Sequence, residues 1–216
     1  SGFSIVTYTG TGSNATVGHG LSTAPELVIV KHLTASAAGH SDYWFVYAEP
    51  LTVTNVLLLD TTGAMYSGGS GAWNSIAPTS TVFSIGSDTT TNELDDLFVT
   101  YCFSSIEGYS KVGIYEGNNN ADGPFIYTGF KPAFVMIKGA DQAGSSWFLL
   151  DNKRDPYNEV NRELFADATA AEGTGNGTLD FLSNGFKSRG SDSINYASTM
   201  IYIAVAESPF KYSNAR

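Results

Sequence analysis

The sequence predicts an all-β protein, a β-sandwich of the jelly-roll or concanavalin-like kind. Short runs of β-branched and aromatic residues recur along the chain, bounded by Gly, Asn, Asp and Ser, which is the pattern of strands and turns. The composition, with 23 glycines, 13% aromatic and only 15% charged residues, is typical of a turn-rich β protein. Helical spacing is confined to residues 159–165, which predict about two turns of helix at most.

The expected strands fall into two successive sets. The first set covers residues 3–8, 26–31, 43–47, 55–59, 82–85 and 97–103, and the second covers residues 112–115, 133–138, 146–150, 179–182 and 199–205. Residues 27–30 and 134–137 are apolar at every position instead of alternating, which indicates strands buried on both faces. We therefore expect these two runs at the centre of the fold.

The two sets of strands belong to a sequence repeat. Anchor residues of the first half return in the second half, most of them 107 positions later. The matching pairs are Tyr8 and Tyr115, Gly10 and Gly117, Pro25 and Pro132, Val28 and Val135, Lys31 and Lys138, Trp44 and Trp147, and Asp60 and Asp167. A unit of this length is sandwich-sized, since solenoid repeats are about 20–50 residues long. We predict two homologous β-sandwich repeats, residues 1–107 and 108–216, packed as one body because only a short stretch joins them.

Charge excludes one class of partner. The net charge is -10, and residues 1–107 hold one cation against nine acids, whereas residues 108–216 hold ten cations against twelve acids. An acidic chain without a basic stripe is repelled by phosphate, so we expect no nucleic-acid binding. No apolar stretch of about 18 residues and no signal-peptide pattern occurs, so we expect no membrane insertion. The chain begins with Ser1 instead of methionine, and we take it for a piece of a longer protein.

No cofactor or metal site is expected. A chain of 216 residues buries enough surface to fold without a metal or disulfide, and Cys102 lies in an apolar run that predicts a buried side chain. Two acidic stretches, residues 93–96 and 118–123, lack the ligand spacing of a calcium loop. The three histidines are scattered, and we expect surface imidazoles at His19, His32 and His40.

The candidate site is a polar segment that follows the strand containing Trp147. Residues 151–158 are rich in hydrogen-bonding groups, whereas the matching residues 48–54 of the first repeat are nearly uncharged. Carbohydrate sites on sandwich loops combine an aromatic face with carboxylate, amide and guanidinium groups. The predicted ligand-binding residues are Trp147, Asp151, Arg154, Asp155, Tyr157 and Asn158.

An alternative explains the same segment without a ligand. Arg154 can pair with Asp151 or Asp155 inside the turn, and Pro156 can fix the bend. No catalytic residues are assigned, because the second half has no histidine and no serine lies in a Gly-x-Ser-x-Gly turn. Nothing in the sequence selects a pair of carboxylates for glycoside hydrolysis.

Several phrases of the sequence are distinctive. They are Gly-Phe-Ser-Ile-Val-Thr-Tyr-Thr-Gly at 2–10, Leu-Ser-Thr-Ala-Pro-Glu-Leu-Val-Ile-Val-Lys at 21–31, Trp-Asn-Ser-Ile-Ala-Pro-Thr-Ser-Thr-Val-Phe at 73–83, Thr-Gly-Phe-Lys-Pro-Ala-Phe-Val-Met-Ile-Lys at 128–138, Ala-Glu-Ser-Pro-Phe-Lys-Tyr-Ser-Asn-Ala-Arg at 206–216, and the shorter phrases at 107–111 and 181–187. Together they resemble a duplicated C-terminal domain of tail-fibre-like proteins of tailed bacteriophages, especially marine ones. The resemblance spans essentially the whole chain.

The resemblance implies an extracellular virion component at the distal end of a fibre or tail, involved in host attachment. It carries over no catalytic or binding residues. We expect a non-enzymatic, lectin-like receptor-binding module that binds bacterial surface carbohydrate, contacts other virion proteins and forms a homotrimer, since fibres are built about a threefold axis. A purely structural virion component, such as a capsid decoration or fibre-packing domain, is the alternative. A polysaccharide depolymerase is a third, weaker hypothesis.

Overall fold

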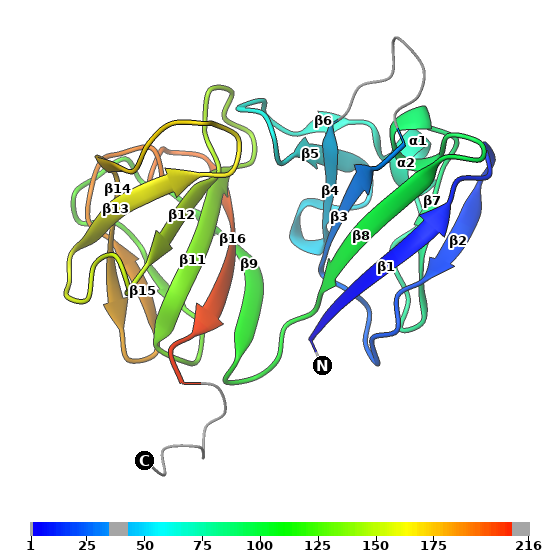
Figure 1. The fold of residues 1–216 in the computed structure, drawn as a ribbon. Helices are drawn as coiled ribbons and strands as arrows, with labels where there is room; N and C mark the ends of the chain where they lie inside the picture. Colours follow the sequence, from blue (N-terminus) through cyan, green and yellow to red (C-terminus); the bar gives the residue numbers. More distant parts are fainter. Residues whose placement is uncertain (1, 35–42, 209–216) are drawn as a thin grey trace. The chain divides into compact units, whose positions relative to one another are not determined.

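A computed structural model describes residues 2–34 and 43–208 of the protein (Figure 1). The fold is nearly all β, with 45% of the residues in strands and 6% in helices, which confirms the predicted all-β sandwich class. The chain divides into two compact units. Unit 1 comprises Ser1–Asp60 and Met65–Ser104, and unit 2 comprises Thr61–Ala64 and Ser105–Arg216.

Unit 1 contains a large antiparallel sheet and a small one. The large sheet has the strand order β1 (Phe3–Thr9), β8 (Leu97–Phe103), β3 (Leu27–His32), β4 (Trp44–Ala48), β5 (Asn55–Leu58) and β6 (Tyr66–Ser67). The small sheet pairs β2 (Ala15–Gly18) with β7 (Val82–Ile85). Three short helices complete the unit: η1 (Glu49–Leu51), α1 (Gly69–Trp73) and α2 (Thr89–Asn92).

The core of unit 1 draws on both sheets. Val28 and Phe45 come from the large sheet, Phe83 and Ile85 from β7, and Trp73 from α1, and all five belong to one cluster of buried side chains. Every second side chain of β3 points into this cluster, and this face of the strand is therefore apolar. Two layers therefore enclose one core, as in a sandwich.

Unit 2 is built on a single eight-stranded antiparallel sheet. Its strand order is β10 (Phe125–Tyr127), β15 (Gly185–Ser188), β14 (Gly173–Leu182), β13 (Val160–Phe165), β12 (Phe148–Asp151), β11 (Pro132–Gly139), β16 (Thr199–Ala206) and β9 (Ser110–Glu116). A side chain links the two outermost strands, since Lys111 Nζ on β9 donates to the carbonyl oxygen of Tyr127 on β10 at 3.0 Å. The sheet therefore curls until its two edges approach each other.

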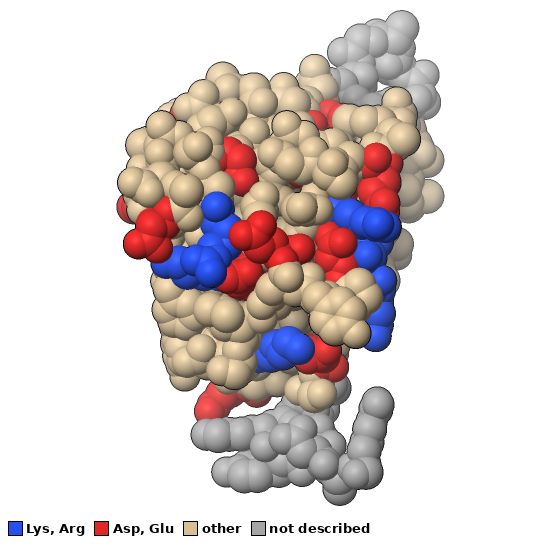
Figure 2. Space-filling view, turned by 90° about the vertical axis from the view of Figure 1, so that its left-hand side faces the viewer, with Lys and Arg blue, Asp and Glu red and all other residues tan. Residues whose placement is uncertain are grey.

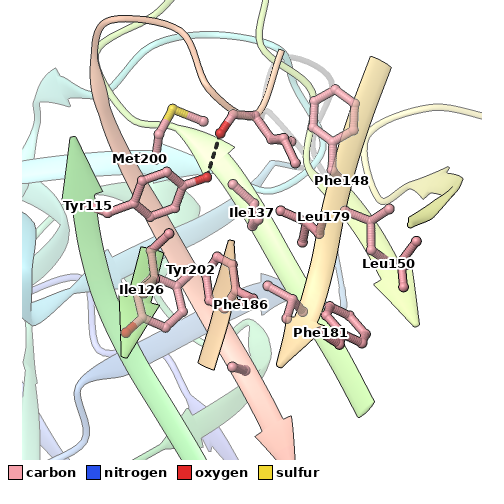
Figure 3. Close-up of a cluster of buried hydrophobic side chains, with 14 of the residues drawn as sticks. Tyr115, Ile126, Ile137, Phe148, Leu150, Leu179, Phe181, Phe186, Met200 and Tyr202 are labelled. Carbon is pink, nitrogen blue, oxygen red and sulfur yellow. Dashed lines mark hydrogen bonds between the residues drawn. The ribbon is translucent and has the colours of Figure 1, made fainter. Parts of the chain in front are cut away.

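Aromatic side chains fill the inside of this curled sheet (Figure 3). Phe186 and Tyr202 meet edge to face with ring centroids 5.2 Å apart, and Tyr115 packs beside both. The Tyr115 hydroxyl donates to the carbonyl oxygen of Ile194 at 2.5 Å. Burial raises the pKa of Tyr115 well above its usual value, so this hydroxyl stays a neutral donor.

The two units follow the same strand order over most of their length. In unit 1 the path β1-β8-β3-β4-β5 matches β9-β16-β11-β12-β13 in unit 2, and the pair β2-β7 matches β10-β15. The difference lies in β14, which joins the corresponding strands of unit 2 into one sheet, whereas β6 of unit 1 has only two residues. The shared order agrees with a duplicated unit, while the duplication itself stays a prediction.

Burial of the central strands matches the sequence pattern in unit 1. All four residues of 27–30 are at most 6% exposed. In unit 2, Val135 and Ile137 are fully buried, whereas Phe134 and Met136 are only partly buried. Cys102 is fully buried as predicted, and burial raises the pKa of its thiol to about 12.

Two predictions about local structure are wrong. Residues 159–165 do not form a helix, because Val160–Phe165 is strand β13, paired on one side with β12 and on the other with β14. Sheet pairing overrides the weak helical spacing of this stretch. His19 and His32 are not surface imidazoles, since they are 1% and 2% exposed. His40 lies outside the described residues.

Each buried histidine has polar partners. The Nε2 atom of His19 lies 3.0 Å from the carbonyl oxygen of Thr79, and its Nδ1 accepts the N–H of Leu21 at 3.1 Å. The Nε2 atom of His32 lies 2.8 Å from Oδ2 of Asp96. Within the described residues, no three His, Cys, Asp or Glu side chains are grouped to hold a metal ion, and no helix is long and apolar enough to cross a membrane.

Candidate functional site

Trp147 does not form part of a binding surface. Its side chain is 1% exposed, and Lys138 Nζ lies 5.8 Å from the centroid of its ring. Its backbone N–H donates to Asp167 Oδ1 at 2.7 Å. A ligand therefore has no access to the indole face. The prediction of Trp147 as a ligand-binding residue is wrong, because the side chain is buried inside the protein.

Asp151 and Arg154 form an internal ion pair. Arg154 Nη2 lies 2.6 Å from Asp151 Oδ2, and the same nitrogen donates to the carbonyl oxygen of Leu149 at 3.1 Å. Asp151 Oδ1 accepts the backbone N–H groups of Lys153 and Arg154 at 2.8 and 2.9 Å. These contacts close the turn after β12, as the salt-bridged alternative predicts for this pair.

The pKa of Asp151 reflects this environment. Burial alone would raise it, but the backbone N–H groups of Arg154 and Lys153 and the Arg154 guanidinium outweigh burial and lower the pKa below its usual value. The carboxylate is therefore ionised at neutral pH, and its hydrogen bonds stabilise the turn.

Asp155 and Asn158 fasten the next part of the loop. Asp155 Oδ2 accepts the backbone N–H groups of Asn161 and Arg162 at 2.8 and 2.7 Å, which fixes the loop to β13. Asn158 pairs with Phe181 of β14 in both directions: its Nδ2 donates to the carbonyl oxygen at 3.1 Å, and its Oδ1 accepts the N–H at 2.9 Å. Both side chains hold the loop in one conformation.

Tyr157 is the exposed member of the predicted set. Its side chain is 86% exposed, although the residues around it are held in place. It borders a hollow of about 220 Å³, which we call the loop hollow, lined among others by Lys131, Asn152, Asp155, Tyr157, Asn158 and Phe181. The structure thus brings three of the six predicted residues to one concave surface and adds Lys131 and Asn152, which sequence reasoning missed.

A larger hollow lies in the same unit. We call it the seam hollow; it has a volume of about 650 Å³ and is lined among others by Glu107, Tyr127, Phe130, Lys131, Ser183 and Glu207. Tyr127 is 60% exposed, and Lys111 Nζ lies 5.6 Å from the centroid of its ring. This cation–π contact and the hydrogen bond from Lys111 to the Tyr127 carbonyl hold the tyrosine at the seam between the edge strands.

One chain of polar contacts connects the two hollows. Lys131 lines both hollows, and its Nζ lies 2.8 Å from Glu207 Oε2. Glu207 Oε1 accepts a hydrogen bond from Asn152 Nδ2 at 2.9 Å. Within the described part of the chain, Asn152 Oδ1 is buried and has no hydrogen-bond partner.

Among the described residues of unit 2, most cations form ion pairs with acids. Figure 2 shows Lys and Arg side chains next to Asp and Glu side chains across one face of the molecule. The ion pairs of unit 2 include Lys131 with Glu207, Arg154 with Asp151, Arg162 with Asp155 and Glu172, Lys187 with Asp122, and Arg189 with Asp180. The second half has more cations than the first, but the described ones lie beside acids and form a mixed-charge surface instead of a strongly basic patch.

Comparison with known proteins identifies a family without an assigned activity. No curated protein and no solved structure matches the chain. Residues 1–209 match the model of a domain of unknown function (DUF7483), and the chain therefore belongs to that family.

Proposed function

We propose that this protein is a non-enzymatic, lectin-like adhesion module of a phage tail fibre, which binds bacterial surface glycan at the loop hollow of unit 2. One observation carries the proposal: Tyr157 is 86% exposed on a loop whose other polar residues are fixed. An aromatic ring on a rigid loop offers a flat apolar face to the C–H surface of a sugar and loses little entropy on binding.

The polar groups of the loop hollow suit the hydroxyl groups of a sugar. The Lys131 side chain is 47% exposed, and its Nζ retains donors beyond its contact with Glu207. Such a shallow site binds weakly by itself. In a homotrimeric fibre attached to other virion proteins, several weak sites together give tight attachment to a cell surface.

The acids near the hollows support a non-enzymatic role. Asp155 accepts two backbone N–H groups, and Glu207 contacts both Lys131 and Asn152. Glycoside hydrolysis requires one carboxyl group as a proton donor and another as nucleophile or base. Asp155 and Glu207 already bind other groups of unit 2, so neither carboxylate is free for one of these two roles.

A structural role in the virion is the second candidate. The observation in its favour is that Asp151, Arg154, Asp155 and Asn158 all make their hydrogen bonds within unit 2. A loop whose side chains bind chiefly to their own unit needs no ligand. A capsid decoration or fibre-packing domain would use the unit in this way, with contacts only to neighbouring virion proteins.

A glycan array of bacterial surface polysaccharides, probed with the purified protein, distinguishes the two candidates. The adhesion proposal predicts binding that Tyr157→Ala reduces about tenfold or more, the loss typical of an aromatic contact at the centre of an interface. Tyr66→Ala is the matched control, since Tyr66 is 43% exposed in unit 1. An array without any bound glycan, or equal binding by Tyr157→Ala, favours the structural role.

A further inference from the structure

We infer that the loop hollow and the seam hollow form one continuous site for an extended oligosaccharide of several sugar units. This inference rests on the proposed function and adds the substrate class and the residues Tyr127, Lys131, Asn152 and Glu207. The ligand lies across Lys131, with one end against Tyr157 and the other against Tyr127.

The shared wall of the two hollows supports a single site. Lys131 lines both of them, Asn152 lines the loop hollow and Glu207 lines the seam hollow. The contacts of Glu207 with Lys131 and with Asn152, at 2.8 and 2.9 Å, hold these three side chains together. A ligand that crosses from one hollow to the other therefore meets a preformed group of polar side chains.

The size of the hollows selects an extended ligand. The loop hollow of about 220 Å³ is smaller than typical small-molecule sites, which begin at about 300 Å³, whereas the seam hollow of about 650 Å³ lies within their range. The loop hollow alone has room for little more than a single sugar. Joined to the seam hollow, it accommodates a chain of several units.

A hydrogen-bond donor is available where the oligosaccharide would cross from one hollow to the other. Asn152 lines the loop hollow, and its Nδ2 donates to Glu207 Oε1, which keeps the Lys131–Glu207 pair in place at the crossing point. Lys131 Nζ can donate to a hydroxyl or ring oxygen while it keeps its contact with Glu207. Because Glu207 compensates the charge of Lys131, this crossing point suits a hydroxyl-rich chain without requiring an anionic group.

Two exposed tyrosines mark the ends of the site. Tyr157 is 86% exposed at the loop hollow, and Tyr127 is 60% exposed at the seam hollow. Lys111 holds Tyr127 by a hydrogen bond to its carbonyl oxygen and by a cation–π contact with its ring. Two such platforms separated by polar groups fit a chain that presents alternate apolar faces and hydroxyl edges.

The test measures affinity against chain length. The probe is an array of bacterial capsular and surface oligosaccharides, each immobilised at lengths from one to eight sugar units. The intact protein is expected to bind one of these series, with affinity rising about tenfold or more between the disaccharide and the hexasaccharide, the gain expected from a second aromatic contact. Tyr127→Ala is expected to abolish this gain, and Tyr127→Phe to retain it. Thermal denaturation confirms that each variant is folded.

The outcomes separate the two proposals. If short and long chains bind equally, or if Tyr127→Ala binds long chains like the wild type, the extended site is wrong while adhesion at Tyr157 stands. If no series binds the folded wild-type protein, the proposed function fails and the extended site fails with it. If Tyr157→Ala weakens every length and Tyr127→Ala weakens only the long chains, both proposals are supported.

Discussion

The side-chain amides of Asn92 and Asn195 make hydrogen bonds to backbone groups at corresponding places in the two units. Asn92 is fully buried, and its Nδ2 donates to the carbonyl oxygens of Ser13 and Gly86 at 2.7 and 2.6 Å. Its Oδ1 accepts the backbone N–H of Thr11 at 2.7 Å. One side-chain amide thus fastens the loop after β1 to the segment after β7, where no strand pairing satisfies these backbone groups.

Asn195 makes the same connections in unit 2. It is also fully buried, and its Nδ2 donates to the carbonyl oxygens of Asn120 and Gly190, both at 2.8 Å. Its Oδ1 accepts the backbone N–H of Asn118 at 3.0 Å. Identical use of a buried amide in both units supports the proposal that one ancestral unit was duplicated.

Asn92→Ala and Asn195→Ala are each expected to lower the free energy of unfolding by about 2–4 kcal/mol, because several buried backbone groups lose their partner. Urea denaturation measures the change. The exposed Asn184 provides the control, and Asn184→Ala is expected to cost less than about 1 kcal/mol. A cost below 1 kcal/mol for both buried sites would show that the amides are not structural connectors.

Arg154→Ala is expected to destabilise unit 2 by about 1–2 kcal/mol, since it removes the ion pair with Asp151 and the hydrogen bond to Leu149. Arg162→Ala, at a side chain that is 52% exposed, is the control and is expected to change stability by less than about 1 kcal/mol. Glycan binding per folded molecule is expected to be unchanged by Arg154→Ala. Lost binding at full stability would instead restore Arg154 to the ligand site.

The same ion pair predicts an acid-dependent stability difference. The pKa of Asp151 is lower in the folded protein than in the unfolded chain, where it is about 3.9. Its contribution is therefore present above that value and is lost as the pH falls through the folded-state pKa. The stability difference between the wild type and Arg154→Ala is expected to shrink as the pH is lowered from about 6 to about 2. A difference that stays constant over this range contradicts the assignment.

Lys138 predicts a change of stability at alkaline pH. Its side chain is fully buried, its Nζ donates to the carbonyl oxygen of Ser145 at 2.5 Å, and burial lowers its pKa to about 8, with Asp167 opposing part of that shift. The unfolded-state pKa is about 10.4, so the charged form costs stability below pH 8 and the cost is relieved as the pH rises toward 10. We expect the wild type to gain stability relative to Lys138→Met between these pH values, as measured by urea denaturation. A flat difference would show that Lys138 is not held in its buried position.

Metal removal is expected to have no effect. No cluster of three potential ligands occurs in the described ranges 2–34 and 43–208, and burial of apolar side chains accounts for each core. The melting temperature with excess EDTA is therefore expected to equal that without it. A drop of many degrees on chelation would reveal a bound ion.

The sequence predicted those features of the fold that depend on evenly spaced anchors. Lys31 and Lys138 each lie 5.8 Å from the ring centroid of the neighbouring tryptophan, Trp44 or Trp147. The repeated anchors thus make the same contact in both units, although the pair is buried in unit 2 and only partly buried in unit 1. Asn92 and Asn195 could not be paired from the sequence, because the residues that flank them differ between the two halves. Residues shared by the two halves of the sequence identify equivalent strands. Equivalent loop residues are found only when the two units are compared in three dimensions.

The candidate site was predictable only in part. Residues 151–158 stood out because they differ in charge from the first half, and Tyr157 is indeed exposed beside a hollow. Burial could not be deduced for Trp147, since aromatic residues occupy cores as often as binding surfaces. Lys131 and Glu207 are far apart along the chain, and only folding of the sheet brings them into contact.

The central claim is that the loop hollow binds glycan, and a crystal structure of the protein soaked with the best-binding glycan of the array tests it most directly. The account predicts a sugar ring stacked on Tyr157, with a sugar oxygen within hydrogen-bond distance of Lys131 Nζ. Sugar bound only elsewhere on the protein, with the loop hollow filled by solvent at saturating ligand, would contradict it.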